Sequence, residues 1–240
     1  MRIGVYVGEL APATHGGGAV FQRELLKELA RQNKDFELYV YYFGDIGDVP
    51  EGTNIRLVRL NKISMLADRL HTVRDLRFIL TFGCKARYSF LNGIAKRDSI
   101  ELMYFPFPFS FAETEVPYLY TVWDLGGDVH PYFPEVSMAH RNFEVRRRLY
   151  LSALPKAMFV LIGNNTGKKQ LEEYYHVRAD RIVTNPMITP GYIRSAESDD
   201  GILQKLCLER GRYLFYPAQF WPHKNHIRVV EAMRGRTATR

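Results

Sequence analysis

Met1-Arg-Ile-Gly-Val-Tyr-Val-Gly8 opens the chain, and Gly16-Gly-Gly18 leads from it into Ala19-Val-Phe-Gln-Arg-Glu-Leu-Leu-Lys-Glu-Leu-Ala30. The first segment is rich in β-branched residues and carries no charge after Arg2, which is typical of a strand buried on both faces of a parallel sheet. The last segment has apolar residues at helical spacing: Phe21, Leu25, Leu26 and Leu29. Strand, glycine-rich loop and helix in this order predict the start of a βαβ unit.

The glycine triplet, together with His15, is the first candidate ligand loop. Because glycine has no Cβ, the backbone N–H groups at the mouth of the helix can approach an anion or a sugar closely. The alternative is that the glycines only form a turn, but three in a row directly before a helix favour a ligand loop. A dinucleotide-binding fingerprint would follow the strand at once, whereas residues 9–15 intervene here. The loop also lacks the Gly-Lys-Ser/Thr of a nucleoside-triphosphate site.

The composition indicates an ordinary globular protein. The chain has 240 residues, of which 46% are hydrophobic and 25% charged, enough for one large domain or one domain plus part of another. No apolar run reaches the ~18 residues of a membrane span, and we expect no signal peptide because the chain begins in a strand. Cys84 and Cys207 lie far apart, so we predict reduced thiols in a cytoplasmic protein.

Much of the net charge of +7 comes from residues 61–97, which contain eight Lys and Arg residues and only two Asp residues. Apolar residues are interleaved with them, so this basic amphipathic stretch could form helices that lie on an anionic membrane. The favoured alternative is a solvated helix face over a core. We do not expect nucleic-acid binding, because the basic residues follow helical spacing without a recognisable binding module.

The rest of the chain alternates strands with helices. Strands are predicted at residues 36–43, 54–60, 100–105, 117–122, 157–162 and 181–184. Helices are predicted at residues 63–97 (two, around Gly83), 137–153 with Ser137 as the cap, and 168–175 with Asn164, Asn165 or Thr166 as the cap. The pattern predicts an α/β fold, a mostly parallel sheet with helices on both faces.

Unusual residues follow several of these strands. They are the glycine triplet, the loop from Pro106 to Phe111, Trp123-Asp124 and Gly163–Thr166. Ligands of open parallel sheets bind outside the carboxyl ends of the strands, so these residues are expected to line one cleft. Phe105, Phe107, Phe109 and Phe111 could stack on a sugar or touch a lipid carrier, but packing held rigid by the two prolines is the favoured role.

A second unit is expected to begin at Arg212, with another strand, a loop, and a helix over residues 227–233. The loop brings Lys224 to a helix N-terminus, which suits a phosphate. His223 and His226 lack a carboxylate or thiolate partner in the sequence pattern, so we expect loop and cap roles for them and no metal.

At these residues the chain resembles the retaining glycosyltransferases of family 4 (group 1), which have the GT-B fold. The resemblance runs from Arg2 to about Met233. It rests on the glycine triplet, Thr121–Leu125 with Pro131–Pro134, Phe159–Thr166 and, most strongly, Phe215–Asn225. It implies two Rossmann-like domains: an acceptor-side domain at residues 1–190, a linker at 191–211, and at 212–240 the start of the domain that binds the NDP-sugar.

The resemblance also implies roles for single residues. Trp123 and Asp124 stand at the catalytic position, where the family usually has His-Asp. His15, Gly16, Gly17 and Gly18 form the acceptor and phosphate loop, and Gln219, Lys224 and Asn225 bind the donor diphosphate. Ala218-Gln219 replaces the usual Gly-Arg, which removes one cation from this site. No metal or cofactor is implied beyond the NDP-sugar co-substrate.

The function implied is transfer of a hexose, with retention, from an NDP-sugar to a hydroxyl of a glycan or lipid-linked acceptor, in polysaccharide or glycan biosynthesis. We expect a cytoplasmic location, peripheral at the inner face of the membrane if residues 61–97 touch it. Two such domains need roughly 300–400 residues, so the chain is expected to be truncated and inactive by itself. The alternative is a non-catalytic remnant that only binds an acceptor or a membrane surface. A nucleotide-sugar dehydrogenase or epimerase would need the glycine fingerprint that the first loop lacks.

Overall fold

The computed structural model describes residues 1–10, 17–47, 49, 54–61, 90–108, 110–137, 142–195 and 201–237. The chain divides into two compact units. The sheet unit comprises Met1–Leu125 and Arg146–Pro190, and the C-terminal unit comprises Gly126–Val145 and Gly191–Arg240. Each unit is described by itself.

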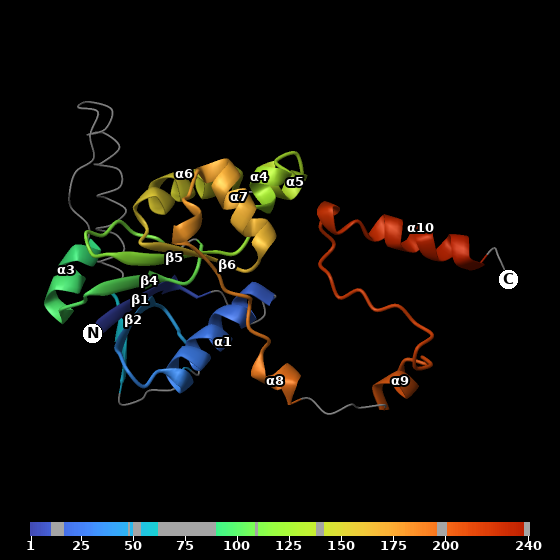
Figure 1. Cartoon of the computed structure of the whole chain (residues 1–240). Coiled ribbons are helices and arrows are strands. Elements are labelled where there is room, and N and C mark those ends of the chain that lie inside the picture. Colours follow the sequence, from blue (N-terminus) through green and yellow to red (C-terminus); the bar gives the residue numbers. More distant parts are fainter. Residues whose placement is uncertain are drawn as a thin grey trace. The chain divides into compact units, whose positions relative to one another are not determined.

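The sheet unit is built on seven parallel strands in the order β3-β2-β1-β4-β5-β6-β7 (Figure 1). The strands are β1 (Arg2–Glu9), β2 (Glu37–Phe43), β3 (Ile55–Arg59), β4 (Leu102–Phe105), β5 (Tyr118–Val122), β6 (Phe159–Ile162) and β7 (Ile182–Thr184). Its helices are α1 (Gly17–Gln32), α3 (Phe90–Asp98), most of α6 (Asn142–Ala153) and α7 (Asn165–Tyr175), with single 3-10 turns at Leu154–Lys156 and Ala179–Arg181. The predicted α/β fold with a parallel sheet is confirmed.

The direction of each crossover decides which face of the sheet a helix covers. Helix α1 joins β1 to β2, whereas α7 joins β6 to β7 in the opposite direction across the sheet. Because parallel crossovers are right-handed, the two helices lie on opposite faces (Figure 1). The alternation of β1 matches: Val5 and Val7 pack in one buried cluster with Leu26 of α1, and Tyr6 packs in the other with Leu171 of α7.

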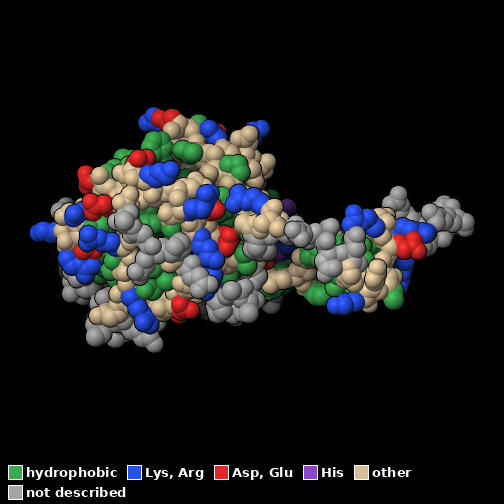
Figure 2. All heavy atoms as spheres, turned by 90° about the horizontal axis from the view of Figure 1, so that it is seen from below, with side chains coloured by type: hydrophobic (Ala, Val, Ile, Leu, Met, Phe, Trp, Pro, Cys, Tyr) green, Lys and Arg blue, Asp and Glu red, His purple; other side chains and the backbone are tan. Residues whose placement is uncertain are grey.

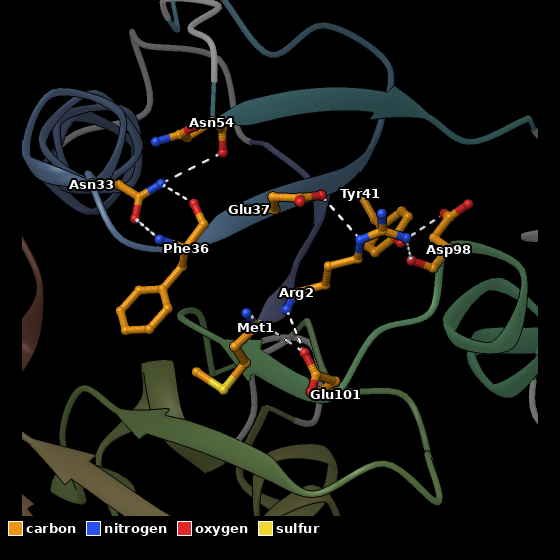
Figure 3. Close-up of polar contacts among 9 residues, drawn as sticks. All are labelled: Met1, Arg2, Asn33, Phe36, Glu37, Tyr41, Asn54, Asp98 and Glu101. Atoms are coloured by element: carbon orange, nitrogen blue, oxygen red, sulfur yellow. Dashed lines mark hydrogen bonds and ion pairs between the residues drawn. The ribbon is translucent and has the colours of Figure 1, made fainter.

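A polar network joins the amino ends of the central strands (Figure 3). Arg2 of β1 donates its Nε to Glu37 of β2 at 3.0 Å and its backbone N–H to Glu101 at 2.8 Å. The Tyr41 hydroxyl donates to Asp98 Oδ2 at 2.8 Å. These contacts lie at the edge of the sheet opposite the carboxyl ends of the strands. We therefore assign them a role in stabilising the sheet and none in the ligand cleft predicted at the carboxyl ends.

The C-terminal unit contains the helices α4 (Gly126–Val129), α5 (Pro134–Ser137), α8 (Gly191–Arg194), α9 (Gly201–Lys205) and α10 (His226–Thr237), and the 3-10 turn η4 (Pro222–Lys224). Helix α10 agrees with the helix predicted at residues 227–233. The strand expected from Arg212 is wrong: residues 213–221 form no strand. A strand needs a neighbouring strand for its backbone hydrogen bonds, and no described residue of this unit forms one.

The cap predictions have mixed outcomes. Asn164 caps α7, because its side chain accepts the N–H of Gly167 at 2.8 Å. The prediction that Ser137 begins a long helix is wrong, since Ser137 is the last residue of α5 and its hydroxyl donates to the carbonyl of Phe133 at 3.1 Å. Helix α6 begins separately at Asn142.

The basic stretch 61–97 is described only at its ends. Residues 62–89, including Gly83 and Cys84, lie outside the described residues, and the last part forms α3. There Arg97 forms a bidentate ion pair with Asp98. In the described part of the chain, no helix is long and apolar enough to cross a membrane. Cys207 is an exposed free thiol.

Candidate functional site

The carboxyl end of β1 is held against the loop that follows β4. Ser110 donates its hydroxyl to the carbonyl of Val7 at 2.6 Å. The next residue, Gly8, has a positive φ of 70°, and a Cβ there would lie 3.2 Å from the Ser110 hydroxyl. Glycine at this position therefore permits both the backbone turn and the close approach of the loop.

The aromatic residues of this loop are mostly buried. Phe105 and Phe107 are almost completely covered, and Phe105 packs edge-to-face on Phe111 with ring centroids 5.0 Å apart. Tyr120 of β5 donates its hydroxyl to the carbonyl of Pro108 at 2.5 Å. The packing interpretation is thus confirmed for Phe105 and Phe107, while Phe109 lies outside the described residues.

Trp123, directly after β5, closes over the start of α1. A Cβ built on Gly18 would lie 3.0 Å from the Trp123 ring, whereas one on Gly17 would meet nothing within 4 Å. The ring also packs edge-to-face on Phe21 of α1, with centroids 5.5 Å apart. The structure therefore brings together two predicted site segments that are far apart in the sequence. His15 and Gly16 lie outside the described residues.

The polar group of Trp123 is engaged in the fold. Its Nε1 donates to the carbonyl of Pro106 at 3.3 Å, which ties the end of β5 to the loop after β4. The indole has no other hydrogen-bond donor. Trp123 therefore presents an aromatic surface beside the glycine loop, where a histidine would present a polar nitrogen.

Asp124 is an exposed polar group at this edge. Its Oδ1 pairs with the guanidinium of Arg146 on α6 at 3.0 Å, and the Asp124 side chain is 62% exposed. Arg146 is partly buried and is a functional candidate that the sequence analysis missed. It stands among three consecutive arginines, Arg146–Arg148, and nothing in the spacing distinguishes the one that faces Asp124.

Gly163–Thr166 follows β6 at the same edge of the sheet. The Asn164 side chain is used as the cap of α7, and the Asn165 side chain accepts the hydroxyl of Thr184 at 3.3 Å. On β4 and β5, Thr121 donates its hydroxyl to that of Tyr104 at 3.2 Å. Burial raises the pKa of Tyr104 above its ordinary value, so this phenol stays neutral at physiological pH.

The predicted diphosphate loop of the C-terminal unit folds back on itself. Tyr216 donates its hydroxyl to the carbonyl of Lys224 at 2.9 Å, and Trp221 donates its Nε1 to the side-chain oxygen of Gln219 at 2.5 Å. Asn225 adopts a left-handed conformation with φ 53°, which ends η4 directly before α10. Lys224 thus stands at the helix N-terminus, as the sequence predicts.

His226 packs against the residues of this loop. Its Nε2 lies 3.2 Å from the carbonyl of Ala218, and its ring packs against Tyr216 and Phe220 at centroid distances of 4.9 and 4.6 Å. These contacts give His226 a packing role. In the described ranges, no group of three or more His, Cys, Asp and Glu side chains could hold a metal ion.

Comparison with known proteins finds similar solved structures but no family. No protein-family model matches the chain, and no curated protein matches it. The crystal structure of Anabaena Alr3699/HepE in complex with UDP is similar, with a TM-score of 0.41 and 13% sequence identity. The similarity covers 86% of this chain and 50% of that one. At this identity and TM-score the likeness assigns no role to any residue of this chain.

Proposed function

We propose that the chain belongs to a retaining GT-B glycosyltransferase that moves a hexose from an NDP-sugar to a hydroxyl of a glycan or lipid-linked acceptor. The observation that carries the proposal is the contact of Trp123, the residue before Asp124, with Gly18 in the first turn of α1. Both segments lie at the carboxyl edge of a parallel sheet, where such folds bind ligands. The residues that resemble family 4, in both units, support the same reaction.

The chemistry needs positive potential at the leaving group. The bond between the sugar C1 and the diphosphate oxygen breaks, and C1 bonds to the acceptor oxygen. Negative charge therefore grows on the phosphoryl oxygens, while the acceptor proton leaves with the nucleotide. Within the sheet unit we propose the N-terminus of α1 as an anion site, and within the C-terminal unit we propose the N-terminus of α10 together with the Lys224 ammonium.

In this proposal Asp124 and Trp123 divide the role that the family usually gives to a His-Asp pair. Asp124 is the exposed acceptor for sugar hydroxyls, and its ion pair with Arg146 fixes the direction of the carboxylate. The Trp123 ring packs on Gly18. Its Nε1 already donates to the carbonyl of Pro106, so in this proposal Trp123 contributes an aromatic surface and no polar contact. We propose that no metal takes part, with the backbone N–H groups and Lys224 meeting the diphosphate charge.

Two substitutions of Gly17 test the proposed phosphate loop. A Cβ at Gly17 would meet nothing within 4 Å, so we expect both Gly17→Ala and Gly17→Asp to fit the fold. Aspartate at the first turn also stabilises a helix, so unfolding does not explain a loss of binding. We expect Gly17→Asp to weaken binding of UDP, GDP or ADP by at least about tenfold, because its carboxylate occupies the anion position.

Isothermal titration of the three nucleoside diphosphates measures this effect. Gly17→Ala is the matched control and should bind the preferred nucleotide as the natural chain does. An unchanged isotherm for Gly17→Asp would remove the glycine loop from the proposed site.

A further inference from the structure

Two segments of the C-terminal unit that are 88 residues apart are joined at Glu135 and His223. Glu135 Oε1 accepts the backbone N–H of His223 at 3.1 Å, and the same oxygen contacts the imidazole Nδ1 of His223. The ring of Phe133 packs edge-on against that imidazole, with centroids 6.0 Å apart. Helix α5 is thereby bound to η4, the turn that carries Lys224.

The Glu135 carboxylate is unusually covered for a surface helix. Its side chain is only 9% exposed, and its second oxygen, Oε2, is buried without a hydrogen-bond partner among the described residues. Burial by itself would raise the pKa of Glu135. Hydrogen bonds from its own backbone N–H and from His223 outweigh burial, so the pKa lies below its usual value. A buried polar atom without a partner costs free energy, which the bonds at Oε1 must offset.

The two bonds to His223 differ in what they constrain. The bond to the imidazole fixes a side chain, whereas the bond to the N–H fixes the backbone one residue before Lys224. On the other side, the carbonyl of Lys224 is held by the Tyr216 hydroxyl at 2.9 Å. The backbone around Lys224 is therefore fixed from both sides.

We infer that Glu135 is a positioning residue for Lys224: its carboxylate holds η4 in the geometry that presents Lys224 at the N-terminus of α10. The role of Lys224 toward a diphosphate rests on the proposed function, whereas the holding of η4 does not. Sequence spacing gives no hint of this link, because Glu135 and His223 are 88 residues apart.

Hydrogen exchange of the backbone N–H groups at residues 223–228 tests the link directly. We expect Glu135→Ala to speed exchange of the His223 N–H by about tenfold or more. His223→Ala keeps the backbone bond and should have a smaller effect. Glu135→Gln, which retains an oxygen acceptor at the same reach, should restore most of the protection.

A spectroscopic signature separates this role from general destabilisation. The ¹⁵N shift of the His223 Nδ1 should change in Glu135→Ala and stay unchanged in Glu144→Ala, the matched control. Glu144 is exposed, lies in the same unit and stands on α6. Equal exchange and an equal imidazole shift in Glu135→Ala and the natural chain would overturn the inference.

Binding of pyrophosphate to the same variants tests the step toward the ligand. We expect Lys224→Ala and Glu135→Ala both to weaken pyrophosphate binding, and Glu144→Ala to leave it unchanged. If Lys224→Ala binds pyrophosphate as the natural chain does, the proposed diphosphate site fails, while the exchange data still decide the role of Glu135. If Lys224→Ala weakens binding but Glu135→Ala does not, the positioning inference fails and the site stands.

Discussion

At the residue scale, Asp98 links α3 to β2. It accepts two bonds from the Arg97 guanidinium at 2.8 and 2.7 Å and one from the Tyr41 hydroxyl of β2. The bond from Arg97 lowers the pKa of Asp98, partial burial acts against this, and the bond from Tyr41 adds to the lowering. The charged form of Asp98 therefore stabilises the folded chain.

The direction of this shift fixes the pH dependence of stability. Because the folded-state pKa is depressed, the stabilisation is present above the unfolded value of about 3.9 and is lost as the pH falls through the folded value. We expect Asp98→Asn to lower the free energy of unfolding by about 1 kcal/mol at pH 7. Urea unfolding at pH 7 and at a pH below 3 measures the difference, which should shrink in acid.

Asp180→Asn is the matched control for this prediction. Asp180 forms a similar bidentate pair with Arg178, but its side chain is 63% exposed. Water screens such a pair, so the substitution should change stability little at either pH. A loss for Asp98→Asn that is no larger than the loss for Asp180→Asn would contradict the assigned role of Asp98.

Sequence reasoning at this scale finds residues whose type is unusual and misses their partners. Trp123 and Asp124 stand out because they follow a buried strand, and the structure packs the Trp123 ring on Gly18. The partner of Asp124 is Arg146, and the partner of His223 is Glu135. Both partners are ordinary surface residue types at unremarkable spacing, so only the three-dimensional path of the chain identifies them.

At the element scale, Gly18 allows the Trp123 ring to cover the first turn of α1. A methyl group at Gly18 would lie 3.0 Å from that ring. We expect Gly18→Ala to destabilise the chain by about 1–3 kcal/mol through overpacking, although alanine is the better helix former. Gly17→Ala, which meets open space, should be neutral or slightly stabilising. Thermal unfolding of the two variants makes the comparison.

A double substitution shows whether the indole is the cause. Combining Gly18→Ala with Trp123→Phe removes part of the ring and should cost less than the two single changes added together. Strict additivity would mean that the ring and the helix start are independent, contrary to the contact in the structure.

The elements that sequence reasoning predicted correctly are those whose pattern is set by burial alone. Val5–Val7 and Val160–Ile162, for example, are short apolar runs. Such runs are typical of strands that are buried on both faces of a parallel sheet. The strand expected near Tyr213–Phe220 also begins as a short apolar run but does not form, because a strand depends on a neighbouring strand that the local sequence does not encode. The end of α5 at Ser137 was missed, since a serine suits the start of a helix as well as its end.

At the scale of the whole molecule, the two units differ in how far their apolar side chains are buried. The sheet unit buries two continuous clusters. In the C-terminal unit, Phe215, Phe220 and Ile227 are 77%, 90% and 73% exposed, and hydrophobic side chains are visible at its surface in Figure 2. Contiguous apolar surface of this kind binds dyes and other apolar surfaces.

We therefore expect the chain to bind the dye ANS through the C-terminal unit. Replacing Phe215, Phe220 and Ile227 together by serine should lower ANS fluorescence and reduce self-association. It should leave the unfolding of the sheet unit unchanged, because none of the three belongs to its buried clusters. Leu151→Ser, which removes an exposed apolar side chain from α6, is the control and should keep the fluorescence of the natural chain. ANS fluorescence that survives the triple substitution would place the apolar surface elsewhere. Loss of fluorescence together with unaltered unfolding would assign the dye-binding surface to these three side chains.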